Sequence, residues 1–151
     1  MAECKACEFL SNFHMSEPDL TKRLEILKAA KTVAVVGVSD KPDRPSYGVV
    51  KWLMANTPYE LYFVNPVITE LFGQRVYKSL SDIPVKIDLV DVFRNPRDIP
   101  PVMDAAIAIG AKVFWMQLGI SEADAAEKGL AAGLDVVQNA CIKIEYDHLL
   151  K

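Results

Sequence analysis

The segment Thr32-Val-Ala-Val-Val-Gly-Val-Ser39 is short, continuously apolar and rich in β-branched residues, which is typical of a parallel strand buried on both faces. It is followed by Asp40-Lys-Pro-Asp-Arg-Pro-Ser46, after which a helix-like pattern resumes. Gly37 permits a tight backbone turn, and Ser46 is suited to cap the following helix. Backbone amides at a helix start, together with Arg44, are suited to bind a phosphate group. The segment therefore predicts a strand–turn–helix unit of the kind that binds nucleotides.

The turn departs from the Gly-x-Gly-x-x-Gly pattern of nicotinamide-dinucleotide sites. Ser39 stands at the position of the second glycine and Pro42 at that of the third. NAD-binding units usually end their second strand with an Asp or Glu that binds the ribose hydroxyls, whereas this chain has Asn65-Pro66. Asn can hydrogen-bond a ribose, but it lacks the carboxylate that repels a phosphate. These departures disfavour NAD, and the missing carboxylate leaves room for a ligand that is phosphorylated on its ribose.

Strand-like and helix-like segments alternate along the chain, which calls for parallel strands joined by right-handed crossovers. The predicted strands are 32–38, 60–64, 87–93, 112–116 and 134–137, and the predicted helices are 18–30, 46–56, 100–109, 121–132 and 141–150. A loop with Gly73 and a helical turn at 79–83 follow the second strand, and Ser121-Glu-Ala-Asp124 resembles a capping box. The pattern predicts an α/β, Rossmann-like, doubly wound five-stranded parallel sheet in one domain, residues 17–151, after an extension at 1–16.

Composition bounds the classes of function. The chain has 151 residues, of which 51% are hydrophobic, so it suffices for one domain with a sizeable core. Its formal charge of −3 gives no general attraction to nucleic acid or anionic membranes, and no apolar stretch approaches the roughly 20 residues of a membrane span. Three cysteines and a start unlike a secretory signal fit a reducing compartment. We expect a cytoplasmic protein without nucleic-acid or membrane partners.

Polar segments follow each predicted strand, at the edge of a parallel sheet where ligands bind. They are Ser39–Ser46, Asn65-Pro66, Phe93-Arg-Asn-Pro96, Gln117-Leu-Gly-Ile120 and Asn139-Ala-Cys141. Each is individually compatible with an ordinary turn. Together they predict a rim with a few cations, several amides and apolar surface, as a nucleotide with a long organic tail requires.

In this order, the segments resemble the stand-alone coenzyme A-binding domain family, related to the N-terminal CoA-binding domain of the succinyl-CoA synthetase α subunit. The carrying motifs are Val36-Gly-Val-Ser39, Pro42-x-Arg44-x-Ser46, Val64-Asn-Pro66, Gly73 with Val76-Tyr77 and Ser79-Leu80, Asp88-Leu-Val-Asp-Val-Phe-Arg94, Trp115-Met-Gln-Leu-Gly-Ile120, Ala132-Gly-Leu134 and Cys141-Ile-Lys-Ile-Glu145. The resemblance covers roughly residues 20 to 148. It implies a Rossmann-like domain that binds CoA or acyl-CoA without a known reaction of its own.

The resemblance also implies the residues that border the ligand. They are Gly37, Val38, Ser39, Lys41, Arg44, Ser46, Asn65, Pro66, Phe93, Arg94, Gln117, Gly119 and Ile120. Lys41 is the candidate for a peripheral ribose phosphate. Gln138-Asn139-Ala140 departs from the Asp-Arg-containing segment of the family, so contacts made there in relatives do not carry over.

The sequence shows no set of residues typical of the active site of a hydrolase or a transferase. We therefore predict no catalytic residue. Cys141, if it begins the last helix, is either a small packed residue or a redox thiol that forms a mixed disulfide with CoA. Cys4-x-x-Cys7 with His14 offers three zinc ligands but no evident fourth, so we predict no metal site. The predicted function is storage, regulation or thiol-redox sensing.

Two other functions stay open. One is an NAD(P)-dependent oxidoreductase of Rossmann type, which the missing glycines and the missing ribose carboxylate disfavour. The other is a ligand-free protein-interaction module, whose protein partner the sequence does not reveal.

Overall fold

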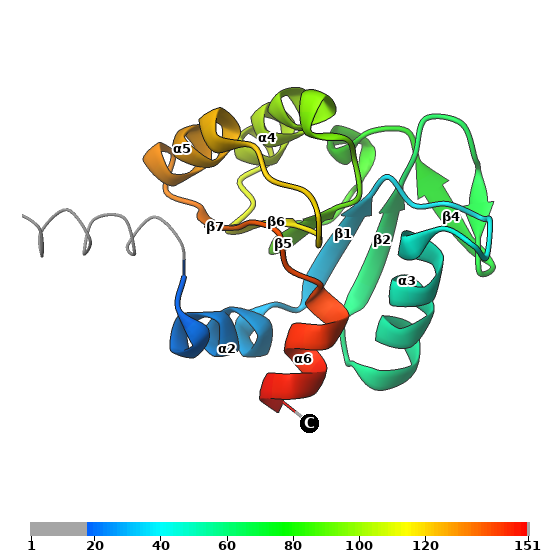
Figure 1. Ribbon diagram of the computed structural model, residues 1–151. Coiled ribbons are helices and arrows are strands. Elements are labelled where there is room, and N and C mark those ends of the chain that lie inside the picture. The colour runs from blue at the N-terminus through cyan, green and yellow to red at the C-terminus, as the bar shows by residue number, and fades with distance from the viewer. Residues whose placement is uncertain (1–17, 151) are drawn as a thin grey trace, which may run out of the picture.

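A seven-stranded sheet forms the centre of the chain, which a computed structural model describes over residues 18–150 (Figure 1). Its strands are β1 (Thr32–Val36), β2 (Glu60–Val64), β3 (Glu70–Leu71), β4 (Gln74–Tyr77), β5 (Leu89–Val92), β6 (Val113–Met116) and β7 (Asp135–Val137). They lie in the order β3-β4-β2-β1-β5-β6-β7, in which β3 and β4 are antiparallel and every other neighbouring pair is parallel.

The chain reverses its direction of winding at β1. It first proceeds from β1 to β2 and β4 on one side, and then returns to place β5 against the other side of β1. Val36 lies opposite both Val64 of β2 and Val92 of β5, so the three strands end at the same level. In open α/β sheets such a reversal leaves a crevice outside the carboxyl ends of the two diverging strands.

Helices cover both faces of the sheet (Figure 1). One face packs against α2 (Leu20–Ala29), α3 (Pro45–Asn56) and α6 (Ile142–Leu150), and the other against α4 (Ile99–Ala108) and α5 (Ala123–Ala131). Two short 3₁₀ turns are η1 (Leu80–Asp82) and η2 (Pro96–Asp98). Within β1, Val33 and Val35 contact the first helical layer while Ala34 and Val36 contact the second. This two-sided burial explains the continuous apolar run, since neither face of the strand meets water.

The doubly wound fold and the five predicted parallel strands are confirmed, but the sheet is wider than predicted. Residues expected to form a loop around Gly73 instead form the β3–β4 hairpin. Its Glu70, Gln74 and Arg75 are exposed at the edge of the sheet. The hairpin therefore lacks the apolar run that marks the other strands, and its strands have only two and four residues.

The structure also corrects element ends. Gly37 has a φ of +87°, and β1 ends at Val36, two residues earlier than predicted. The cap of α5 is Glu122, whose side chain accepts a hydrogen bond from the Ala125 amide, so the capping box predicted to begin at Ser121 is wrong. The predicted extension at 1–16, with Cys4, Cys7 and His14, lies outside the described residues. Within residues 18–150, no helix has the length and apolar character to cross a membrane.

Candidate functional site

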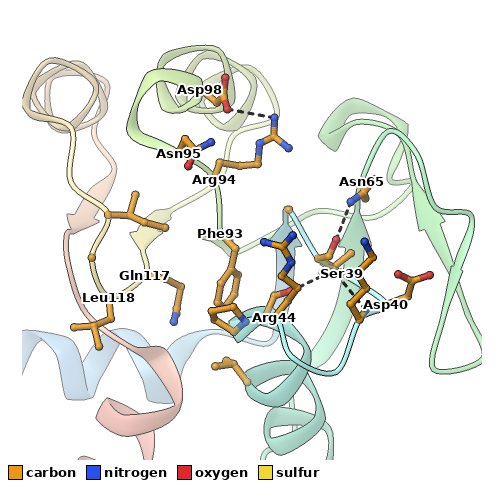
Figure 2. A pocket seen from close by; sticks show the side chains of 18 of the residues that line it. Ser39, Asp40, Arg44, Asn65, Phe93, Arg94, Asn95, Asp98, Gln117 and Leu118 are labelled. Carbon is orange, nitrogen blue, oxygen red and sulfur yellow. Dashed lines mark hydrogen bonds and ion pairs between the residues drawn. The ribbon is translucent and has the colours of Figure 1, made fainter.

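A cavity of about 970 Å³ opens at the carboxyl ends of β1, β2, β5 and β6, where the winding reverses (Figure 2). This is near the upper end of the range of about 300–1,000 Å³ that ligand pockets occupy. Every residue predicted to border the ligand lines it, and so does Cys141. Asp40, Pro45, Asn95, Pro96 and Leu118 also line it and belong to the predicted rim segments, whereas Val49, Val67, Ile68, Arg97 and Asp98 lie outside them.

The floor of the cavity depends on a close approach between the turns after β1 and β5. A β-carbon added to Gly37 would lie 2.3 Å from the Phe93 carbonyl oxygen and 2.9 Å from the Arg94 Cδ. The Gly37 amide donates to the Val64 carbonyl, and the Phe93 amide donates to the Val36 carbonyl. Glycine is therefore required here both by its left-handed backbone and by the lack of space for a side chain.

The turn after β1 is organised by its own two serines. The Ser39 amide donates to Ser46 Oγ at 3.0 Å, and the Lys41 amide donates to Ser39 Oγ at 3.1 Å. Ser46 is buried at 3% exposure and lies inside the first turn of α3. The prediction that Ser46 caps α3 is wrong, because the cap is Arg44, followed by Pro45 at the first helical position. The two hydroxyls thus hold the turn together by accepting the amides of Ser39 and Lys41.

Asn65 joins the turns after β1 and β2. Its Nδ2 donates to the Val38 carbonyl at 2.7 Å (Figure 2). Its Oδ1 accepts from the amides of Val67 at 2.7 Å and Ile68 at 3.3 Å. Both ends of the amide are thus engaged inside the protein. A ribose contact by this side chain stays a prediction, while its structural task is visible in these bonds.

The cavity carries an excess of positive charge. Lys41, Arg44, Arg94 and Arg97 line it, against the carboxylates of Asp40 and Asp98. This contrasts with the whole chain, whose formal charge is −3. Clustered cations in a cleft raise the local concentration of anionic ligands.

Asp98 is a residue that the sequence reading missed. Its Oδ2 lies 3.5 Å from Arg94 Nη2, and the two side chains are 37% and 38% exposed, which anchors Arg94 beside the cavity (Figure 2). The spacing of four residues between Arg94 and Asp98 was the available signal, because it brings side chains together in a helical turn.

The turn after β6 is tied to the start of α6. Gln117 is only 3% exposed, and its Oε1 accepts from the Ile142 amide at 3.0 Å. The Gly119 amide donates to Asn139 Oδ1 at 2.6 Å. Cys141 is partly exposed and free, and its carbonyl accepts the Glu145 amide in the first helical bond of α6. Cys141 therefore directly precedes α6, which begins at Ile142, one residue later than predicted.

The segment that departs from the family pattern has structural partners of its own. Gln138 Oε1 accepts from the Glu122 amide at 2.9 Å, and the Ala140 carbonyl accepts from Trp115 Nε1 at 2.8 Å. Together with Asn139, these bonds hold the β7–α6 connection against β6 and the start of α5. The sequence analysis placed Asn139 on the predicted rim and did not reveal these bonds, because the partners are distant along the chain.

A buried carboxyl lies on β5, two residues before Phe93 of the cavity lining. Asp91 has 0% exposure, and neither of its side-chain oxygens has a hydrogen-bond partner among the described residues. Because side chains alternate along a strand, Asp91 shares a face with Phe93, which lines the cavity. Burial raises the pKa of Asp91 well above its usual range. The protonated, neutral form is therefore the one that fits this position.

Comparisons with known proteins agree with this geometry. A family model described as CoA binding domain matches residues 31–147. The uncharacterized protein YneT of Bacillus subtilis (strain 168) is 38% identical over 132 residues, which are 87% of this chain and 97% of that protein. The solved structure of a hypothetical protein from Pyrococcus horikoshii OT3 is 38% identical, with a TM-score of 0.86, and the match covers 90% of this chain and 95% of that one.

A third relative is much larger. The ADP-forming acetate–CoA ligase I subunit alpha of Pyrococcus furiosus is 34% identical over 96 residues, which are 60% of this chain but 21% of that protein. The likeness therefore concerns one part of the ligase subunit. Given the family match over most of its length, this chain belongs to the CoA binding domain family and is homologous to the CoA-binding part of ADP-forming acyl-CoA ligases.

Proposed function

We propose that this protein binds CoA or acyl-CoA in the cavity at the ends of β1, β2, β5 and β6, in a storage, regulatory or redox role without turnover. The supporting observation is the four-cation lining of that cavity in a chain of negative net charge. CoA carries a pyrophosphate and a ribose phosphate, which require cations and backbone amides. The match to one fifth of a ligase subunit supports binding and gives no ground for ligase activity.

The chemistry of the lining suggests how CoA would lie. Its pyrophosphate would face the amides and cations of the turn at 37–46, with Lys41 toward the ribose phosphate. The adenosine would lie near Asn65 and Phe93. The pantetheine would follow the turn at 117–120, where Leu118 and Ile120 offer apolar surface.

This orientation brings the thiol end of CoA toward Cys141. In the redox role, a peroxide oxidises Cys141 to a sulfenic acid and is itself reduced to water. The CoA thiol then attacks the sulfenic sulfur, which forms the mixed disulfide and releases a second water. The start of α6 favours negative charge, and Cys141 is accessible from the cavity.

Titration calorimetry with CoA, acetyl-CoA, NADH and NADPH tests the binding. We expect heat of binding from CoA or acetyl-CoA and none from the nicotinamide cofactors. Tight NAD(H) binding with none for CoA would overturn the proposal in favour of an oxidoreductase. No binding of any of the four would favour an interaction module.

Intact mass spectrometry tests the redox role. Protein with bound CoA is treated with a small excess of hydrogen peroxide, and we expect a CoA-sized adduct that dithiothreitol removes. Cys141→Ser is the matched control and should bind CoA without forming the adduct. Bound CoA without an adduct on the wild-type protein would leave storage or regulation as the role.

A further inference from the structure

The tip of the β3–β4 hairpin places an aromatic residue in an unfavourable backbone conformation. Leu71 pairs with Gln74, which leaves Phe72 and Gly73 as a two-residue turn. Both turn residues have positive φ, +50° at Phe72 and +74° at Gly73. Such turns favour Asn-Gly, because Asn tolerates the left-handed conformation. A bulky residue there is an outlier that the surrounding structure must hold in place.

The contact that holds Phe72 comes from α3. Its ring centroid lies 4.9 Å from that of Tyr47, at an interplanar angle of 51°. Both side chains also pack against the core on the α2, α3 and α6 face of the sheet. Tilted aromatic pairs at this distance attract each other beyond the burial of their area. An Asn at position 72 would relieve the backbone but lose this contact.

Tyr47 connects the hairpin to the turn after β1. Its amide donates to the Arg44 carbonyl at 3.1 Å, and it directly follows Ser46, whose Oγ accepts the Ser39 amide. The ring contact therefore acts on the first turn of α3, from which the cavity-lining turn is built.

The hairpin also supports the turn after β2. The Asn65 amide donates to the Tyr77 carbonyl of β4 at 2.9 Å, and the Asn65 side chain reaches the Val38 carbonyl. The β3–β4 hairpin thus contacts the turn after β2 directly and reaches the turn after β1 through Tyr47 of α3. Figure 1 shows the hairpin at the edge of the sheet, next to β2 and α3.

We propose that Phe72 is a positioning residue for the cavity: its strained turn presents the ring to Tyr47 and thereby fixes the start of α3 and the turn at 39–46 for ligand binding. The proposal rests on the CoA-binding function proposed above. Phe72 does not line the cavity, so it acts through Tyr47.

Two readouts test this, and one does not depend on CoA. Phe72→Asn suits the turn but removes the ring, whereas Phe72→Tyr retains both ring and strain. Hydrogen exchange of the ligand-free protein reports the amides of residues 39–47. We expect faster exchange there in Phe72→Asn, and wild-type exchange in Phe72→Tyr. The dissociation constant for CoA should rise by about threefold to tenfold in Phe72→Asn, the range expected from an aromatic pair.

Tyr47→Ala approaches the same contact from α3 and covers the case in which Phe72→Asn fails to fold. Its effect should match that of Phe72→Asn, and the double variant should be little worse than either single one. Unchanged exchange at 39–47 in both variants would overturn the proposal. So would faster exchange with an unchanged CoA dissociation constant. If wild-type protein binds no CoA, the binding proposal fails, while the exchange data still decide whether Phe72 orders the turn.

Discussion

Gly37 and Phe93 are packed so closely that a β-carbon on Gly37 would lie 2.3 Å from the Phe93 carbonyl oxygen. Real β-carbons do not approach backbone oxygens to this distance, so one of the two turns would have to move. The contact joins β1 and β5 where the winding of the sheet reverses. It therefore fixes the floor of the cavity through backbone atoms alone.

Gly37→Ala should lower the free energy of unfolding by about 3 kcal/mol, because left-handed strain and overpacking act together. Chemical denaturation measures this loss. Gly133→Ala is the control: Gly133 has a φ of +94°, but an added β-carbon would have no atom within 4 Å apart from those of Gly133 and its two chain neighbours. The control should lose only about 1–2 kcal/mol, the share due to backbone strain. Equal losses in the two variants would show that the close approach is unimportant.

Arg44→Ala should weaken CoA binding without destabilising the protein. The Arg44 guanidinium has no ion-pair or hydrogen-bond partner among residues 18–150, so its removal breaks no internal interaction. A lost charge-assisted contact to phosphate corresponds to about 10–100-fold in the dissociation constant. Calorimetry gives the affinity and thermal unfolding the stability. Lys51→Ala makes the same charge change on α3 outside the cavity lining, and it should bind as the wild type does. If CoA binding were weakened equally in both variants, the effect of Arg44→Ala would come from the change in net charge and not from a specific contact with phosphate.

Asn65→Asp should destabilise the protein and should not create an NAD site. The substitution replaces the Nδ2 donor by an oxygen facing the Val38 carbonyl, where the bond is now 2.7 Å long. We expect a loss of about 1–3 kcal/mol in the free energy of unfolding. Asn95→Asp makes the same chemical change at an exposed cavity residue and should be nearly neutral. A gain of NAD binding in Asn65→Asp would contradict the structural task assigned to Asn65.

Asp91 should make stability fall as pH rises. The folded protein holds the Asp91 proton more tightly than the unfolded chain, whose carboxyl titrates near pH 4. Above about pH 4 the free energy of unfolding therefore falls, by up to about 1.4 kcal/mol per pH unit. The fall ends where the pH reaches the pKa of Asp91 in the folded protein.

Asp91→Asn removes the titrating proton while keeping the shape of the side chain. The difference in unfolding free energy between wild type and Asp91→Asn should fall steadily from pH 4.5 upward (about 1.4 kcal/mol per unit at most). Asp88 acts in another range: burial raises its pKa, but the Lys31 and Thr32 amides and Lys112 outweigh this and lower it. Its contribution to stability is therefore lost below about pH 4. If the unfolding free energies of wild type and Asp91→Asn changed in parallel with pH, ionisation of Asp91 would not be the cause of the loss of stability.

Much of the fold follows from local patterns. The β-branched apolar run of β1 and the polar residues after each parallel strand identified the sheet and the edge that carries the cavity. Every residue expected to border a ligand lies in that cavity, although a contact with CoA stays a prediction for each. The β3–β4 hairpin was missed because its exposed polar residues and its Phe72-Gly73 turn carry no strand or hairpin signal.

The sequence alone determined the alternation of strands and helices, since burial on both faces of a parallel strand demands a continuous apolar run. It also determined the glycine and the cations near the cavity, because these are properties of single residues. Only the tertiary structure decided what the polar side chains do. Asn65, Gln117 and Asn139 were open to a reading as ligand contacts or turn residues, yet their amides bond to backbone groups of other turns. Hydrogen-bond partners far apart in the chain are set by the folded geometry, and no local pattern encodes them.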